Sequence, residues 1–174
     1  MANVDNPHGF WPIARTDGGQ DYVKIMTKLA AYGTAVGLFD PVVYAGTQNN
    51  LERGANAARV FGISLRGSAA STLATHPVLV LDNAVIAEAQ EDGVGGAMGV
   101  DAEQTNADFI VAAANSTTLI SQVEIDSSTA ATTNTLGLKL FKVAPYPDND
   151  GALTNARWFV KFNNLTTADQ AAGV

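Results

Sequence analysis

The sequence predicts a mainly β protein: a barrel or sandwich of short antiparallel strands with an extended N-terminal arm and little helix. Three observations support this class. Short apolar runs recur along the chain, turn residues separate them, and several runs alternate apolar with polar side chains. Strict alternation places one face of a strand against a core and the other against solvent. Many such runs at short spacing are typical of barrels and sandwiches.

The N-terminal residues are expected to differ from the rest, with residues 1–19 forming the arm and residues 20–174 the β body. The arm starts with polar, turn-prone residues and then carries a compact, mainly aromatic group: Phe10, Trp11, Pro12 and Ile13. Proline fixes its own φ and favours an extended residue before it. We expect this group to bind a partner by inserting into a groove. Alternatively, the segment is a first edge strand that packs on the protein's own core.

The β-like runs follow one another after Gly18-Gly19. We expect strands at residues 22–26, 41–46, 59–65, 77–81, 84–89, 109–112, 120–125, 136–143 and 157–162. Asp82-Asn83 separates two of these runs, and both residue types tolerate positive φ, so a two-residue hairpin is expected there. Helix is expected only as a turn or two within 101–108, with Asp101 as its cap.

Two stretches are expected to be loops. Residues 126–135 are rich in hydroxyl side chains, and residues 145–155 are rich in turn residues. Loops of about this length on a rigid β scaffold are where partner contacts tend to lie. Tyr146, in the second loop, therefore joins the residues that we expect to bind a partner.

The charge distribution argues against nucleic-acid binding. The net charge is −7, the ten basic residues are scattered, and none lies between Arg66 and Lys139, a span that holds nine acidic residues. A phosphate backbone requires clustered Lys and Arg. We expect the acidic middle of the chain to face solvent or, alternatively, to meet a basic partner surface.

The sequence also bears on compartment. It has no cysteine, which excludes disulfides, thiolate metal sites and cysteine catalysis. The first seven residues lack the basic and apolar regions of a secretory signal. No apolar run approaches the roughly 20 residues that a membrane helix requires. We expect a soluble protein, made in a cytoplasm, that binds neither membrane nor nucleic acid.

No catalytic, cofactor-binding or metal-binding residues are predicted. The two histidines are His8, in the arm, and His76, expected to be a turn or surface residue rather than a base. Residues 93–99 fail the dinucleotide-binding pattern because Met98 stands where its third glycine belongs and no helix follows. Residues 148–151 resemble part of a calcium loop, but its first and closing ligand positions hold no carboxylate. The protein is therefore not expected to be an enzyme.

A series of phrases along the chain resembles a known family. The opening Asn6-Pro7-His8-Gly9-Phe10-Trp11-Pro12 is followed in order by phrases at residues 39–43, 61–63, 77–80, 88–93, 125–128, 147–149 and 155–164. This ordered set resembles the capsid cement, or head decoration, proteins of tailed bacteriophages. Trp11 departs from the family pattern, in which Arg or a similar polar residue is expected, and this indicates a changed arm contact.

The resemblance implies a structural virion protein that binds the outer surface of the phage head and stabilises the mature shell. The implied partners are a major capsid protein of the HK97-type fold and further copies of the chain, usually a homotrimer and sometimes a dimer. The implied location is the capsid exterior of the virion. If the N-terminal arm only docks, deletion of residues 1–11 is expected to leave a folded oligomer that no longer binds capsids.

Other functions stay open at this point. One is another virion β protein, such as a tail or head-completion component, which copy number per particle would separate from a cement protein. A second is a small glycan-binding β module that uses Trp11, Tyr146 and Trp158 as stacking residues. An enzyme is a third and remote alternative.

Overall fold

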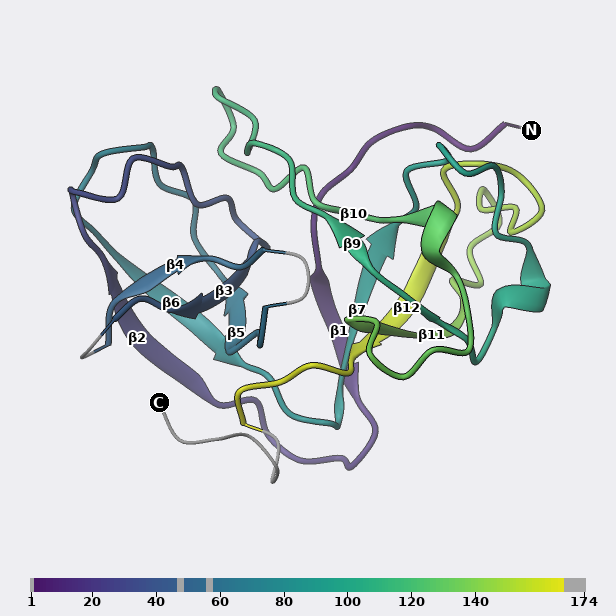
Figure 1. Ribbon diagram of the computed structural model, residues 1–174, viewed down its shortest axis with the longest axis horizontal. Helices are drawn as coiled ribbons and strands as arrows, with labels where there is room; N and C mark the ends of the chain where they lie inside the picture. Colours follow the sequence, from purple (N-terminus) through teal and green to yellow (C-terminus); the bar gives the residue numbers. More distant parts are fainter. Residues whose placement is uncertain (1, 47–48, 56–57, 168–174) are drawn as a thin grey trace.

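The computed structural model describes residues 2–46, 49–55 and 58–167. Strands account for 38% of the structure and helix for 4%, which confirms the mainly β prediction. Two five-stranded sheets carry the fold, and Figure 1 shows them as two halves lying side by side. The strands are short and antiparallel. The sheets are not closed into a barrel, so the sandwich-like alternative fits.

The first sheet has the order β1-β7-β12-β11-β8 and forms the half that we call the β7 half. Its strands are β1 (Trp11–Arg15), β7 (Val85–Gln90), β12 (Arg157–Phe162), β11 (Leu138–Val143) and β8 (Asn106–Ala107). In β12 every second side chain is buried and the others are half-buried, as predicted from the alternation of its sequence. β7 is buried along its whole length because it lies between β1 and β12.

The second sheet has the order β2-β6-β5-β3-β4 and forms the half that we call the β2 half. Its strands are β2 (Val23–Lys28), β6 (Ala74–Val80), β5 (Gly62–Ser64), β3 (Pro41–Tyr44) and β4 (Leu51–Arg53). β4 was not predicted, since a three-residue run gives no readable alternation. The edge strands β2 and β4 approach each other near Thr27, which forms a parallel bridge with Asn50 and whose N–H donates to the carbonyl oxygen of Asn49 (2.8 Å).

The remaining elements are small. β9 (Phe109–Ile110) pairs with β10 (Glu124–Ile125), so the predicted strands at 109–112 and 120–125 are shorter than expected. One 3-10 turn, η1 (Val100–Ala102), occupies the expected helical region, but its cap residue is Gly99 and the prediction for Asp101 is wrong. A second 3-10 turn, η2 (Ser127–Thr129), lies in the first expected loop. Neither expected loop contains a strand.

The predicted hairpin at Asp82-Asn83 is wrong, because β6 and β7 belong to different sheets. Asp82 instead turns the chain from one half into the other. Its Oδ1 accepts hydrogen bonds from the backbone N–H groups of Ala84 (2.9 Å) and Val85 (3.3 Å). Such side-chain bonds to nearby N–H groups offer the backbone an alternative to a ladder.

The N-terminal residues are part of the packed structure. Phe10 is fully buried in the larger hydrophobic core, with its ring 4.7 Å from that of Phe162 and 5.5 Å from that of Phe109. Trp11 follows at once as the first residue of β1, which pairs antiparallel with β7. The edge-strand alternative therefore describes this segment, and the picture of a free arm docking through Phe10 is wrong. Residues 168–174 of the expected body lie outside the described residues.

Candidate functional site

The structure separates the five residues predicted to bind a partner. Phe10 is in the core and contacts no solvent. Trp11 is 53% exposed and stacks on Phe39, with ring centroids 5.9 Å apart. Pro12 and Ile13 line a shallow hollow beside β1, and Trp11 lines a separate groove. Tyr146 lines neither, but its hydroxyl bonds to Glu88, which does line that groove. Of these five residues, only Trp11 thus lines the groove.

That groove, which we call the N-terminal groove, has a volume of about 400 Å³. It lies between residues 2–8, the start of β12 and the loop 148–155. The groove is lined by the following residues: Ala2, Asn3, Val4, Asn6, His8, Trp11, Phe39, Glu88, Gln90, Ile120, Asp148, Asn149, Asn155 and Arg157. Sequence reasoning missed most of them because they come from five separate segments.

Two amide side chains fasten the N-terminal wall of the groove. The buried Gln90 donates to the carbonyl oxygens of Val4 (2.6 Å) and Asn155 (2.8 Å) and accepts from the N–H of Asn6 (2.8 Å). Asn3 exchanges two hydrogen bonds with the backbone of Asp150, each 2.9 Å long. Residues 3–6 are therefore held along the body, and the groove has a fixed wall.

A carboxylate lies at the base of the groove. Glu88 is almost fully buried; its Oε2 accepts a 2.6 Å bond from the Tyr146 hydroxyl, and its Oε1 lies 3.5 Å from Nε2 of His8. Burial acts to raise the pKa of Glu88, but contacts with His8 and Tyr146 and the charge of Arg157 outweigh it and hold that pKa below its usual range. Glu88 is therefore an anion at neutral pH.

The loop side of the groove is a charged and aromatic group. Arg157 donates to Oδ1 of the exposed Asp148 (2.6 Å), and its guanidinium lies 4.6 Å from the centre of the Tyr146 ring. The backbone of Arg157 is also held in place, because its N–H donates to Oδ1 of Asn149 (2.8 Å). The charges of Arg157 and Asp148 thus compensate each other.

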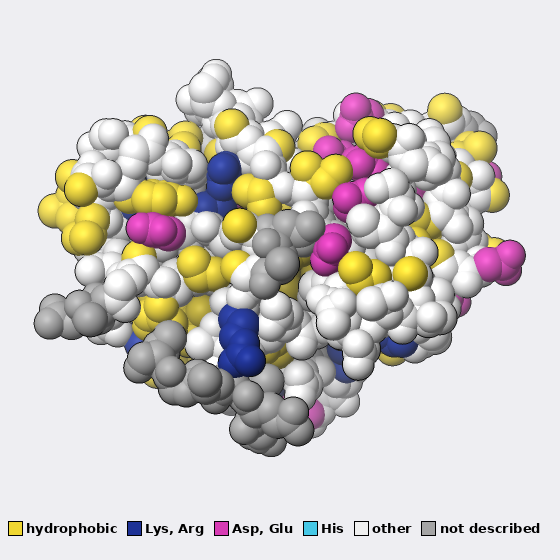
Figure 2. All heavy atoms as spheres, in the orientation of Figure 1, with side chains coloured by type: hydrophobic (Ala, Val, Ile, Leu, Met, Phe, Trp, Pro, Cys, Tyr) yellow, Lys and Arg dark blue, Asp and Glu magenta, His cyan; other side chains and the backbone are white. Residues whose placement is uncertain are grey.

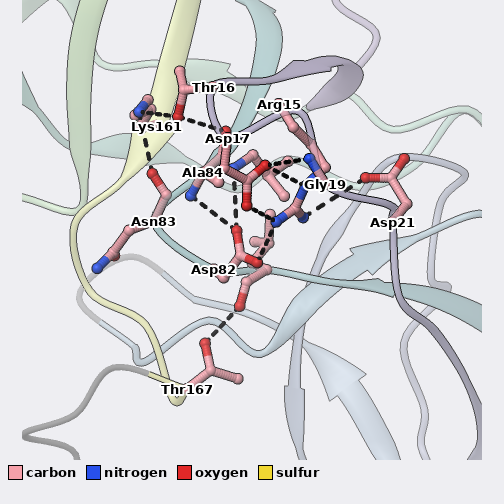
Figure 3. Close-up of polar contacts among 12 residues, drawn as sticks. Arg15, Thr16, Asp17, Gly19, Asp21, Asp82, Asn83, Ala84, Lys161 and Thr167 are labelled. Atoms are coloured by element: carbon pink, nitrogen blue, oxygen red, sulfur yellow. Dashed lines mark hydrogen bonds and ion pairs between the residues drawn. The ribbon is translucent and has the colours of Figure 1, made fainter.

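Figure 3 shows a second polar cluster, at the junction of the two halves. Arg15, at the end of β1, donates to both carboxyl oxygens of Asp17 (3.0 and 2.7 Å) and to Asp82 (2.8 Å). These bonds lower the pKa of Asp17 to about 2. Lys161 reaches the same junction, donating to Thr16 and to the carbonyl oxygen of Asn83. Residues 82–83 carry the chain from β6 in one half to β7 in the other. Two cations of the β7 half hold this segment, Arg15 at Asp82 and Lys161 at Asn83.

The outer edge of strand β2, in the β2 half, carries exposed apolar side chains rather than a polar cluster. Ile25 is 59% exposed and Val23 44% exposed, and both lie on edge strand β2 with Tyr22 just before it. The Tyr22 carbonyl oxygen accepts from Val80 in β6, so the backbone groups of Val23 and Ile25 point away from the sheet. They have no partner among residues 2–46, 49–55 and 58–167. Figure 2 shows exposed hydrophobic side chains over both halves, whereas most of the acidic side chains in this view lie over the β7 half.

Sequence reasoning missed this surface, which we call the β2 edge. The run 22–26 was predicted as a strand, but a sequence does not show which strand ends a sheet. The two lysines of β2 do not reach the surface in question: Lys24 donates to the Tyr44 hydroxyl (2.7 Å), and Lys28 is fully buried. The β2 edge is therefore apolar and carries no charge of its own.

His76 is not a surface residue, and that prediction is wrong. It lies fully buried in β6 between two hydroxyl groups, 2.8 Å from Ser64 and 2.9 Å from Ser68. The Ser64 hydroxyl donates to the Arg66 carbonyl oxygen, so it accepts from Nδ1 of His76, and Ser68 donates to Nε2. Burial, helped by the charges of Arg66 and Lys28, lowers the pKa of His76 to about 4. The ring is a neutral structural link.

Two acidic residues from the middle of the chain, Asp92 and Glu124, lie close to Asp5 of the N-terminal segment. Burial, together with the negative charges of Asp5 and Asp92, raises the pKa of Glu124 to about 7. In the described part of the chain, no group of three or more acidic or histidine side chains is placed to hold a metal ion. No helix among the described residues has both the length and the apolar character needed to cross a membrane.

Comparison with family models and with curated proteins finds no match to this chain.

Proposed function

We propose that this chain is a structural virion protein: a capsid cement, or head decoration, protein that binds the outside of a phage head and stabilises the mature shell. The β2 edge carries the proposal. An unpaired strand edge with exposed apolar side chains is a template for pairing with another polypeptide, and soluble proteins ordinarily block such edges. The order of sequence phrases that resemble the cement family supports the same role.

The mechanism requires no reacting group. A protein that binds the mature lattice and not dissociated subunits stabilises that lattice by mass action. Each contact can be modest, about 800 Å² on each partner. Copies that bind several shell subunits at once multiply modest affinities through effective concentration. The partner in this proposal is a major capsid protein of the HK97-type fold, with further copies of the chain completing a homotrimer.

Binding to heads tests the proposal. Phage heads stripped of this protein are incubated with the recombinant chain, and bound protein is quantified after sedimentation. We expect the amount of bound chain to be proportional to the amount of major capsid protein in the heads. This proportion would distinguish a cement protein from a tail or head-completion component. Ile25→Lys, which places a charge in the β2 edge, is expected to weaken binding at least tenfold.

The matched control is Val100→Lys. Val100 is as exposed as Ile25, at 60%, but lies in η1 of the β7 half. This variant is expected to bind heads like the native chain. Failure of the native chain to bind the head exterior would overturn the function, and full binding by Ile25→Lys would overturn the role of the β2 edge.

A further inference from the structure

We propose that the N-terminal groove is a binding site for a short neutral saccharide, with Trp11 as the aromatic platform. This is a second activity, carried by a different surface from the β2 edge. The groove's volume of about 400 Å³ lies within the ordinary range of small-molecule sites, which are hollows with an apolar lining and a few placed polar groups.

The aromatic platform is Trp11 alone. Its ring is more than half exposed, stacks on Phe39, and meets the His8 ring edge-on, with centroids 6.1 Å apart. An aromatic ring with a polar edge binds a ligand that offers both C–H surfaces and hydroxyl groups. Trp158 is fully buried in the core, and Tyr146 is covered by the Arg157 guanidinium and bonded to Glu88. Neither of them is among the residues that line the groove.

The polar groups of the groove fit hydroxyl ligands. The Asp148 side chain is 70% exposed and uses one oxygen on Arg157, which leaves its second oxygen as an acceptor. Arg157 has further N–H donors than the one that bonds Asp148. A sugar hydroxyl donates and accepts at the same time, so neighbouring acceptors and donors such as these match it.

The charges select a neutral sugar. Glu88 is a buried anion, while Arg157 is already compensated by Asp148. An anionic ligand would meet the Glu88 charge without a free cation to offset it. The fixed wall made by residues 3–6 lowers the cost of binding, because the groove is formed before the ligand arrives.

Titration with defined sugars tests the site. Maltotetraose, cellotetraose and chitotetraose are titrated separately, up to about 10 mM, a range suited to weak sites. Binding is followed by tryptophan fluorescence and by calorimetry. The chain has two tryptophans and Trp158 is buried, so a saturable emission change reports Trp11. We expect at least one sugar to bind.

Three variants locate the binding by calorimetry. Trp11→Ala is expected to weaken it at least tenfold, and Asp148→Ala several-fold, while circular dichroism and melting confirm that both fold. Ile13→Ala is the matched control, since Ile13 is on the same strand and 36% exposed but lies outside the groove. The proposal is overturned if no sugar binds, or if Trp11→Ala binds as the native chain does. Loss of head binding in Trp11→Ala, without sugar binding by the native chain, would make the groove a protein contact instead.

Discussion

Strands β1 and β2 follow each other in the chain, and each forms an edge of one sheet, yet the two edges are built differently. β1 carries Pro12, which has no N–H to offer, and its register with β7 shifts between Pro12 and Ala14. It ends at Arg15, bonded to Asp17 and Asp82. Proline, irregular register and charge are the features that protect a sheet edge from pairing.

β2 lacks the proline and the irregular register, and its two lysines are used inside the β2 half, Lys24 on the Tyr44 hydroxyl and Lys28 in the buried interior. It pairs with β6 over six residues without a shift in register, contains no proline, and presents Val23 and Ile25 outward. The other two sheet edges are short: β4 has three residues and β8 has two. Among the edges of the two described five-stranded sheets, β2 is therefore the one built for pairing with another polypeptide. Four predictions test this contrast, beginning with the largest effect.

The first prediction concerns how firmly the β1 edge is joined to the core. Phe10→Ala removes a ring packed between Phe109 and Phe162 and is expected to cost about 3–5 kcal/mol of unfolding free energy. Trp11→Ala, one residue later and exposed, is expected to cost much less. Urea denaturation of the two variants measures both values. Equal losses would show that β1 is not anchored through Phe10.

The same result bears on whether a chain that lacks residues 1–11 can fold. Because Phe10 is in the core, the shortened chain is expected to be strongly destabilised rather than folded. Loss of head binding on deletion would then say nothing about a docking arm, and Trp11→Ala is the proper variant for that question.

The second prediction concerns pH and the β2 half. His76 has a pKa of about 4 when folded against about 6.5 unfolded. As pH falls from 6.5 to 4, the unfolded chain takes up a proton that the folded chain does not. The unfolding free energy should therefore fall over this window, by up to about 3 kcal/mol from this residue.

Glu124, in the β7 half, acts in the opposite direction. Its folded pKa of about 7 exceeds its ordinary value of 4.5, so the folded chain takes up this proton first and gains stability as pH falls from 7 to 4.5. Urea denaturation at pH 7 and pH 5 separates the two groups. We expect a steeper loss of stability in Glu124→Gln and a reduced or reversed loss in His76→Gln. An unchanged pH dependence in His76→Gln would contradict the buried neutral ring.

The third prediction concerns the junction between the halves. Asp82→Asn keeps an oxygen for the N–H of Ala84 but removes the charge that faces Arg15, and is expected to cost about 1 kcal/mol or less. Burial is the largest single influence on Asp82 and acts to raise its pKa. The hydrogen bonds from Arg15 and Ala84, together with the Arg15 charge, outweigh it, so the pKa of Asp82 is lowered. Its contribution is therefore present above about pH 4 and is lost at more acidic pH.

Asp148→Asn is the control for the junction. It breaks a similar pair with Arg157, but within one loop region rather than between the halves. Urea denaturation at low and high salt compares the two variants. If Asp148→Asn proves the more costly, the junction cluster has no special role in joining the two sheets.

The contrast between the two edges also shows what a sequence can predict. The alternation in residues 157–162 correctly predicted a strand with one buried face, because that pattern is local. The separation of β6 from β7 was not predictable, since Asp82-Asn83 suits a hairpin and a crossing between sheets equally well. Phe10 and Trp11 were grouped as one aromatic anchor, but Phe10, just before β1, is buried in the core, whereas Trp11, the first residue of β1, is more than half exposed. The groove was missed because its lining comes from segments that only the fold brings together.

The smallest expected effect gives the sharpest test of the open edge. Ile25→Lys should change the unfolding free energy by less than about 0.5 kcal/mol, because Ile25 is exposed and its backbone groups face solvent. Met26→Ala, at the next position, should cost about 2–5 kcal/mol, because Met26 is fully buried in the core of the β2 half. Both are measured by urea denaturation of dilute protein. If Ile25→Lys were as destabilising as Met26→Ala, Ile25 would belong to the core and β2 would not be an open edge. A small loss of stability combined with a large loss of head binding would instead mean that Ile25 acts in assembly and not in folding.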